Sequence, residues 1–400
     1  MGLTRIEREA VAAIETTAMR AQVERWAAIN SGTGNLAGLA RMGGELTEAF
    51  AALPGTMRWV DPAPVTRVGG DGAAREAEHG RHLHLSVRPE APVQLLLTGH
   101  MDTVYPDDHP FQTVRETSAG VLNGPGVADM KGGLAVMLAA LQAIEASGAD
   151  MLGYDVVINS DEETGSLASA ALIESTARGK LAALTYEPAL ADGTLAGARG
   201  GTGNFTLVAR GRSAHAGRNP QEGRNALVAA AELAVRLAAE AGPGLSVNPA
   251  RIDGGGPNNV VPDLAVLHVN FRPGDGNAIA RVTEAMNAIV AAVATAHDVR
   301  IEVHGGFNRP PKPLDAGATR LFELVRAVGT DLGIPIGWRD TGGVCDGNNI
   351  AAVGVPVVDT MGVRGGAIHS ADEFVLLDSL AERAALSAVT ILRLAERGRA

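Results

Sequence analysis

The chain of 400 residues contains a single cysteine, Cys345, which excludes an intramolecular disulfide framework. Aromatic residues make up only 3% of the sequence, so the core has to be built from small aliphatic side chains. No stretch approaches about 18 uninterrupted apolar residues, so no membrane span is predicted. The first residues, MGLTRIEREAVAAIE, carry charges throughout and lack the apolar segment of a signal peptide. We therefore expect a cytoplasmic location.

The charge balance excludes a further class of partner. The 34 basic and 45 acidic residues give a formal net charge of -11, and no basic run is present. DNA and RNA are therefore not expected as partners. With 46% hydrophobic and 20% charged residues, the composition is that of a soluble globular protein. The length predicts two or three domains of about 100–200 residues each.

Apolar strands alternate with helical patterns in the first half of the chain. Helices are expected at 4–28, 35–52, 131–146 and 166–178, and strands at 93–99, 155–160 and 182–186. Strand alternating with helix at this spacing predicts a parallel α/β sheet.

The pattern changes near residue 198. Strands at 203–210, 263–271 and 299–304 and helices at about 222–240 and 277–297 predict a ferredoxin-like α+β unit. The Gly/Pro-rich stretch GGFNRPPKP (305–313) ends it as a hinge. The α/β pattern then resumes with helices at 315–332 and 374–397 and a strand at 355–360. We expect a catalytic domain of residues 1–198 and 312–400, interrupted by an inserted domain of residues 199–311.

Five candidate metal ligands occur at or near the ends of predicted strands: His100, Asp129, Glu163, Glu187 and His369. Two of the stretches are distinctive, because LLLTGHMDTVY and VVINSDEETG each run from a buried strand directly into polar side chains. Imidazole and carboxylate donors suit zinc and similar cations. Five ligands exceed one tetrahedral site, so two metals sharing a carboxylate are predicted. This arrangement indicates hydrolysis by a metal-activated water.

His100 and Asp102 stand two residues apart on one strand. The better reading makes His100 a ligand and Asp102 its orienting partner through the other ring nitrogen. The alternative is a strand-end histidine in a polar loop. Asp129 lies in the glycine-rich turn NGPGVADMKGG before a helix, where a capping carboxylate is the alternative.

Glu162 and Glu163 are adjacent carboxylates at the end of a buried strand, where they repel each other unless a cation is present. One can bind metal while the other acts as general base. The alternative is a solvated acidic loop that includes Asp161. Glu187 and His369 are weak evidence singly, but we expect both at carboxyl ends of strands of the same sheet, where ligands gather.

The remaining candidates carry less local information. His215, in SAHAG, follows a strand of the inserted unit and is suited to stabilising an oxyanion, although a loop histidine bonded to backbone is the alternative. Asn259 follows a run of glycines, and Arg272 ends a strand. Cys345 and Gly343 lie in TGGVCDG, and we expect them to line a pocket, because no local histidine favours a cysteine nucleophile.

Six motifs, in order, resemble the M20 family of zinc-dependent exopeptidases and aminoacylases, particularly its glutamate carboxypeptidase-like branch. They are GHMDTVYP, GVADMKGG, DEETGS, YEP, SAHAG and the late His-Ser pair, and the resemblance runs from about residue 20 to the C-terminus. It implies a catalytic domain of zinc-exopeptidase type with a central, mostly parallel sheet. It also implies that the inserted domain is a lid and a homodimer interface.

The resemblance implies a role for each ligand. Asp129 bridges two zinc ions and precedes a cis peptide bond. His100 and Glu187 complete one site, and Glu163 and His369 complete the other.

The resemblance further implies that Glu162 is the general base that deprotonates the bridging water. His215 reaches into the partner subunit's active site and polarises the scissile carbonyl, although the sequence does not decide between action in cis and in trans. Asn259 and Arg272 are similar to lid residues that grip the substrate carboxylate.

Three arginines bear on specificity. Arg309, in NRPPKP, is similar to a basic residue that binds a glutamate side chain. The stretch before Gly200 offers Arg199, whereas glutamate-specific enzymes have a lysine a few residues earlier. Arg364 stands near His369, where a neutral residue is common, and we expect it to add a cation to the pocket. Glutamate preference is left open by these departures.

The sequence thus predicts amide hydrolysis of an N-acyl amino acid or small peptide with a free carboxylate. Zinc is the expected metal, and cobalt or manganese would fit similar ligands. The same motifs suit removal of an acetyl or carbamoyl group. A non-catalytic metal- or ligand-binding relative is disfavoured because Glu162 is present. A two-lobed solute-binding protein would not need the acidic cluster and normally carries a signal peptide.

Overall fold

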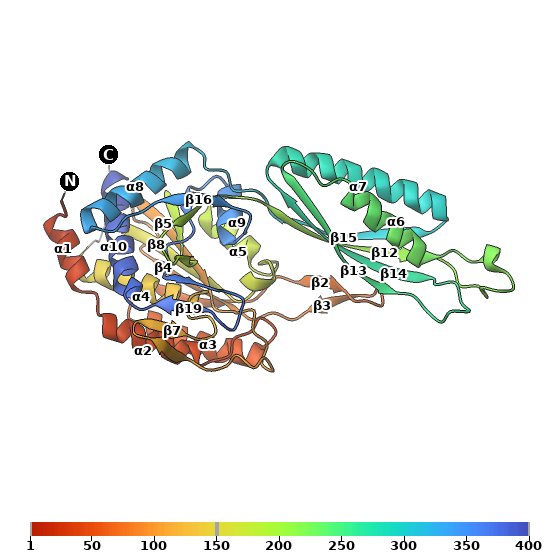
Figure 1. Cartoon of the computed structure of the whole chain (residues 1–400). Coiled ribbons are helices and arrows are strands. Elements are labelled where there is room, and N and C mark those ends of the chain that lie inside the picture. Colours follow the sequence, from red (N-terminus) through yellow and green to blue (C-terminus); the bar gives the residue numbers. More distant parts are fainter. Residues whose placement is uncertain (1, 149–151, 399–400) are drawn as a thin grey trace.

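The computed structural model describes residues 2–148 and 152–398. It contains a large α/β unit and a smaller, elongated unit that projects from its side (Figure 1). The small unit is inserted between β11 (Leu195–Arg199) and α8 (Ala316–Leu332), both of which belong to the large unit. The α/β class and the interrupted catalytic domain are confirmed.

A six-stranded sheet forms the centre of the large unit. Four neighbouring strands are parallel, the fifth strand is antiparallel to them, and the edge strand beyond it is antiparallel to the fifth. Their order across the sheet is β1 (Thr56–Val60), β4 (His82–Val87), β8 (Leu152–Asn159), β5 (Val93–His100), β9 (Ala182–Thr185) and β17 (Val357–Val358). The parallel strands are buried on both faces, because helices cover both sides.

Two groups of helices cover this sheet. One group shares the largest apolar core and comprises α1 (Arg5–Ala12), α2 (Thr16–Ala27), α3 (Leu36–Phe50), α4 (Lys131–Ala146), α8 and α10 (Ser379–Arg397). The second core lies under α5 (Ala170–Ala177) and α9 (Asp346–Ala352). Helix α4 packs closely on the sheet through its first turn, since a Cβ at Gly133 would lie 2.0 Å from the carbonyl oxygen of Tyr186.

Smaller sheets complete the large unit. A five-stranded sheet has the order β10 (Ala189–Leu190), β18 (Arg364–Gly366), β19 (Phe374–Leu376), β7 (Val121–Asn123) and β6 (Arg115–Ser118). Strand β11 pairs with β16 (Trp338–Thr341). The hairpin of β2 (Val65–Val68) and β3 (Ala74–Ala77) bridges the space toward the inserted unit (Figure 1). There Arg210 donates a hydrogen bond of 2.6 Å to the carbonyl oxygen of Gly72.

The inserted unit is an antiparallel sheet with two helices on one face (Figure 1). Its strand order is β13 (Leu245–Gly254), β14 (Leu264–Pro273), β12 (Thr202–Arg210) and β15 (Arg300–Arg309). With α6 (Ala226–Ala238) after β12 and α7 (Gly276–His297) after β14, this is the split βαβ pattern predicted from the sequence. The boundary predicted between residues 198 and 199 falls inside β11, and the boundary predicted between 311 and 312 falls between β15 and α8.

Helix α7 is, within the described residues, long and apolar enough by composition to span a membrane. It instead lies along the inserted sheet and buries Val282, Met286 and Val293 there. This one-sided burial is that of an amphipathic helix covering a sheet.

Three predicted elements differ from the structure. The helix expected at 4–28 is two helices, because a turn at 13–15 lets both Ala10 and Met19 face the core. Residues 305–309 continue β15 instead of forming a hinge, since they pair with the start of β12. The last helix begins at Ser379 and not at 374, because residues 374–376 pair with β7 and β18 as β19.

Candidate metal centre and active site

The predicted ligands converge at the carboxyl edge of the central sheet. His100 ends β5, Glu163 lies in the 3-10 turn after β8, and Glu187 follows β9. These are neighbouring parallel strands, whose carboxyl ends form the usual ligand-binding edge of an α/β sheet. His369 differs, because it lies between β18 and β19 of the smaller sheet. The expectation that it follows a strand of the same sheet was wrong.

The ligands form two triads that share Asp129. In the first, Nε2 of His100 lies 3.1 Å from Oδ1 of Asp129 and 3.8 Å from Oε1 of Glu187. In the second, Nε2 of His369 lies 3.3 Å from Oδ2 of Asp129 and 3.2 Å from Oε2 of Glu163. Within each triad the donor atoms lie within 4.8 Å of one another. The Asp129–Met130 peptide bond is cis, as the resemblance implies.

The donor set fits a metal ion at each triad. Oε1 of Glu187 is buried and has no hydrogen-bond partner among the described residues, as expected for an atom that binds a cation. Burial raises the pKa of Glu187 and raises that of Glu163 to about 7, where the charge of Asp129 adds to the effect. Hydrogen bonds to Asp129 and Glu163 raise the pKa of His369 to about 10. The cluster therefore stabilises positive charge.

Asp102 supports both the histidine and the acidic turn. Nδ1 of His100 lies 2.9 Å from the carbonyl oxygen of Asp102 and 3.3 Å from its carboxylate. The same carboxylate accepts hydrogen bonds from the backbone N–H groups of Glu162 and Glu163, each at 3.2 Å, and from Thr33 at 2.8 Å. Asp102 thus fixes the ring and the turn that carries the predicted base.

Glu373 was not found by the sequence reasoning. Its carboxylate accepts hydrogen bonds from the backbone N–H groups of Gly126, Ala128 and Asp129, at 3.0–3.2 Å, and from Tyr105 at 2.8 Å. It therefore shapes the loop that presents Asp129. The available signal was a second acid shortly after the His-Ser pair, in HSADEF.

A cavity of about 310 Å³ opens over the metal ligands. It is lined by Glu162 together with four of the five ligands, namely Asp129, Glu163, Glu187 and His369. Its outer wall is largely apolar, with Pro188, Leu190, Leu195, Val344 and Ile368.

The polar part of this wall contains both predicted and unforeseen residues. Gly343 and Cys345 line the cavity as expected. Burial raises the pKa of the Cys345 thiol well above its usual range, and its Sγ contacts the carboxylate of Asp359 at 3.5 Å, so a thiolate nucleophile is disfavoured. Arg339, an exposed residue of β16, also lines the cavity and was missed, because an arginine in a short strand carries no motif.

The inserted-unit candidates lie outside this cavity. His215, Asn259 and Arg272 are all exposed. The backbone N–H of Ala216 donates to the carbonyl oxygen of Asn259 at 2.9 Å, so the loops of His215 and Asn259 are neighbours. The loop after β12 lies at the end of the unit remote from the catalytic domain (Figure 1). Within one chain, His215 is therefore not brought to the metal ligands.

Two predicted pocket arginines are engaged elsewhere. Arg364 is paired with Glu382 and Asp378, each at 3.0 Å, and does not line the cavity, so the expected pocket cation is not supplied by this residue. Arg309 is 4% exposed and pairs with Glu162, so its side chain faces the protein interior and not an open glutamate pocket. Arg199 lines the cavity, but its guanidinium is held by Asp359 at 2.7 Å.

A two-unit α/β fold with a His/Asp/Glu cluster at the carboxyl edge of its sheet is the architecture of a metal-dependent hydrolase. Residues 96–393 match Peptidase family M20/M25/M40, and the chain belongs to this family. It is 29% identical over 389 residues to carboxypeptidase G2 of Pseudomonas sp. (strain RS-16), covering 95% of this chain and 90% of that protein. It is 30% identical over 308 residues to succinyl-diaminopimelate desuccinylase of Pseudoalteromonas translucida (strain TAC 125), covering 70% and 78%.

Solved structures show the same fold. A tripeptidase from Staphylococcus aureus aligns with a TM-score of 0.74 at 23% identity, covering 96% of this chain and 100% of that one. An M20 family metallo-carboxypeptidase from Sulfolobus solfataricus aligns with a TM-score of 0.71 at 15% identity, covering 94% and 99%. The protein is thus a metal-dependent hydrolase of the M20 family.

Proposed function

We propose that this protein hydrolyses the amide bond of an N-acyl amino acid or small peptide that has a free C-terminal carboxylate. One observation carries the proposal: Glu162 and the shared ligand Asp129 line the same cavity. Glu162 belongs to neither ligand triad, so its carboxylate lies beside the metal centre and is available to act as a general base. Two relatives, a carboxypeptidase and a desuccinylase, have names that describe cleavage of such amides, which supports the proposal.

We infer two Zn²⁺ ions, with Co²⁺ or Mn²⁺ as chemically suitable substitutes. His100 and Glu187 would hold one ion, Glu163 and His369 the other, and Asp129 would bridge them. When bound, the ions lower the pKa of an attacking water and polarise the scissile carbonyl.

Glu162 would accept the proton of the attacking water and then deliver it to the leaving amine. Burial raises its pKa above the usual range for glutamate, and the charge of Arg309 opposes that rise.

We infer a homodimer through the inserted unit. His215 is exposed at the remote end of that unit, so a second copy is the partner that it could reach. Its imidazole would then stabilise the developing oxyanion in the other copy's site. Asn259, whose loop is hydrogen bonded to that of His215, would bind the substrate carboxylate, as would Arg272.

The cavity wall supports a short acyl group. With a volume of about 310 Å³ and an apolar wall, it accepts an acetyl- or succinyl-sized chain, and Arg339 at its lining offers a cation to an acidic acyl terminus. N-acetyl and N-carbamoyl amino acids are the second candidate substrates, because their short acyl groups also suit a cavity of this volume.

Amine release from a panel of N-acetyl, N-succinyl and N-carbamoyl amino acids and dipeptides tests the function. Zinc-loaded and chelator-treated protein are compared side by side. Chelator-sensitive release from acyl amino acids or peptides is expected, and restoration by added Zn²⁺ is the control. Release that persists after the protein has lost its metal, or no release from any member by zinc-loaded protein, would contradict the proposal.

A further inference from the structure

Arg309 is the last residue of β15, where the inserted unit returns to the catalytic domain. The residue is only 4% exposed, although it lies at the junction between two units. A guanidinium is rarely buried unless carboxylates and hydrogen-bond acceptors surround it. The partners of Arg309 therefore indicate why it is there.

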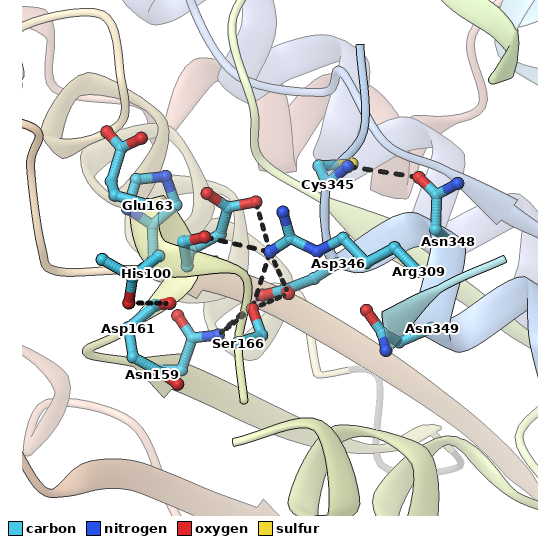
Figure 2. Close-up of polar contacts among 12 residues, drawn as sticks. His100, Asn159, Asp161, Glu163, Ser166, Arg309, Cys345, Asp346, Asn348 and Asn349 are labelled. Atoms are coloured by element: carbon cyan, nitrogen blue, oxygen red, sulfur yellow. Dashed lines mark hydrogen bonds and ion pairs between the residues drawn. The ribbon is translucent and has the colours of Figure 1, made fainter. Parts of the chain in front are cut away.

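The guanidinium contacts the predicted base directly. Nη2 of Arg309 lies 2.7 Å from Oε1 of Glu162 and donates to the carbonyl oxygen of the same residue at 3.1 Å. It also donates to Oγ of Ser166 at 2.7 Å and to Oδ1 of Asp346 at 3.2 Å. Figure 2 shows the guanidinium of Arg309 directed toward Ser166 and Asp346. Side chain and backbone of the acidic turn are thus held by one residue.

The group around Arg309 is itself fixed by the large unit. Asp346, which is 1% exposed, accepts hydrogen bonds from Ser166 at 2.5 Å and from Asn159 at 2.7 Å (Figure 2). Ser166 has a left-handed backbone conformation, with φ of 54°, and its hydroxyl donates to Asp346. One cation thus balances Glu162 and Asp346 inside a connected network.

The backbone on either side of Arg309 is held as well. Asn349 donates to the carbonyl oxygen of Asn308 at 3.1 Å, and Asn348 donates to that of Pro310 at 2.8 Å. Asn348 also donates to the carbonyl oxygen of Gly200 in the other connecting segment, at 2.9 Å. The junction is therefore clamped by α9, and Arg309 projects from it toward Glu162.

We propose that Arg309 is a positioning residue that holds the carboxylate of Glu162 in place. It thereby links this carboxylate to the end of β15, where the inserted unit joins the catalytic domain. By occupying Oε1, Arg309 leaves Oε2 as the oxygen that exchanges a proton with the substrate. Because β15 ends at Arg309, this contact lies where the inserted unit meets the junction that α9 clamps. The inference rests on the proposed function for Glu162.

The rival role is that of a substrate ligand, in which Arg309 leaves the network to bind a carboxylate. Movement of that kind would strip the buried carboxylates of Glu162 and Asp346 of their cation. Leaving a buried charge unpaired is strongly unfavourable, so the observed pairing opposes the rival role.

Steady-state kinetics of R309A, R309K and N349A separate the two roles. N349A is the matched control, because it removes a junction clamp without touching Glu162. For a positioning residue, R309A lowers kcat by about 100-fold with KM within about threefold of wild type, since displacement of a reacting group by about 1 Å costs that much. R309K restores part of kcat, and the inhibition constant of the product amino acid is unchanged. Metal content and thermal unfolding confirm that the variants are loaded and folded.

A rise in KM and in the product inhibition constant of R309A, at nearly normal kcat, would overturn the proposal in favour of the substrate ligand. An equal loss in N349A would assign the effect to the junction alone and would also overturn it. The crystal structure of zinc-loaded wild type gives a readout independent of turnover. An Arg309–Glu162 contact in that structure supports the positioning role, and a separated pair overturns it. If the contact is present but no substrate of the panel is hydrolysed, only the proposed function is contradicted.

Discussion

Single carboxylates at this centre carry distinct tasks because their neighbours differ. Glu163 and Glu187 face imidazoles across 3.2 and 3.8 Å and belong to the ligand triads, whereas Glu162 faces the guanidinium of Arg309 across 2.7 Å. In the proposed mechanism, adjacent residues in the turn after β8 would therefore divide metal binding from proton transfer.

Glu162→Gln removes the proton acceptor but keeps the shape of the side chain. We expect kcat to fall by about 10²–10⁴-fold, the usual share of a general base. Zinc content should stay at the wild-type value, because Glu162 belongs to neither triad. Kinetics on the best panel substrate and elemental analysis check this. Loss of metal in the variant would show that Glu162 is a ligand instead.

Metal affinity should depend on pH through Glu163. Burial raises the pKa of this carboxyl to about 7, so the metal-free site holds a proton below that pH. Zinc must displace this proton and also that of His369, whose pKa is raised to about 10, so affinity is expected to rise with pH through 7 and to keep rising above it. Calorimetric titration in buffers of different ionisation enthalpy measures the released protons. A pH-independent affinity between pH 5 and 7 would contradict the assignment.

Among the elements, the two connecting segments are joined by a buried ion triad. The backbones of Arg199 and Lys312 form an antiparallel β-bridge. Their side chains both contact Oδ2 of Asp359, Nε of Arg199 at 2.7 Å and Nζ of Lys312 at 3.1 Å. Asp359 is fully buried next to α9. The junction is thus stabilised by charge inside the large unit, in addition to the clamps on the carbonyl groups.

Asp359→Asn should destabilise the fold by about 3–5 kcal/mol, because two buried cations lose their counter-charge. Burial raises the pKa of Asp359, but Arg199 and Lys312 outweigh it and hold the pKa below the usual value. A carboxyl group whose pKa is lower in the folded than in the unfolded protein stabilises the fold above the unfolded pKa of about 3.9. This stabilisation is lost as the pH falls through the folded pKa. Chemical unfolding of wild type at pH 7 and pH 3 should therefore show less stability at pH 3.

The control for this variant is Asp378→Asn. Asp378 pairs with Arg364 at 3.0 Å, but its side chain is 75% exposed. An exposed pair contributes about 0–1 kcal/mol, so this variant should unfold almost as wild type does. Equal losses in both variants would contradict a special role for the buried triad.

At the scale of the whole molecule, His215 of the inserted unit lies away from the metal ligands of its own chain. His215 lies on an exposed loop at the remote end of that unit, while the β2–β3 hairpin and the junction hold the unit against the catalytic domain. Completion of the site by a second copy is therefore the arrangement that we infer.

Mixing two inactive variants tests this arrangement. H215A and E162Q homodimers should each be nearly inactive, while random exchange of subunits forms heterodimers with one intact site. If His215 acts in trans, an equimolar mixture should recover about a quarter of wild-type activity, since half of the dimers then carry one working site out of two. Absence of recovery after verified subunit exchange would place His215 in cis or outside catalysis.

The sequence alone determined the fold class and pointed to the candidate ligands that the structure brings together. His100 and the Glu162–Glu163 pair follow apolar strands directly, and strand periodicity is local, so the run and its polar end could be read together. The alternation of elements likewise predicted the interrupted α/β domain. His369 was found from its motif, although its strand belongs to a different sheet.

Tertiary structure alone decided the partners of the charged residues. Arg309 and Arg364 are both arginines in glycine- or proline-rich stretches, yet one is buried against Glu162 and the other pairs with Glu382 at the edge of the fold. Glu373, far along the chain, shapes the Asp129 loop. An ion pair depends on which distant segments meet and on how far water is excluded there, and local sequence specifies neither.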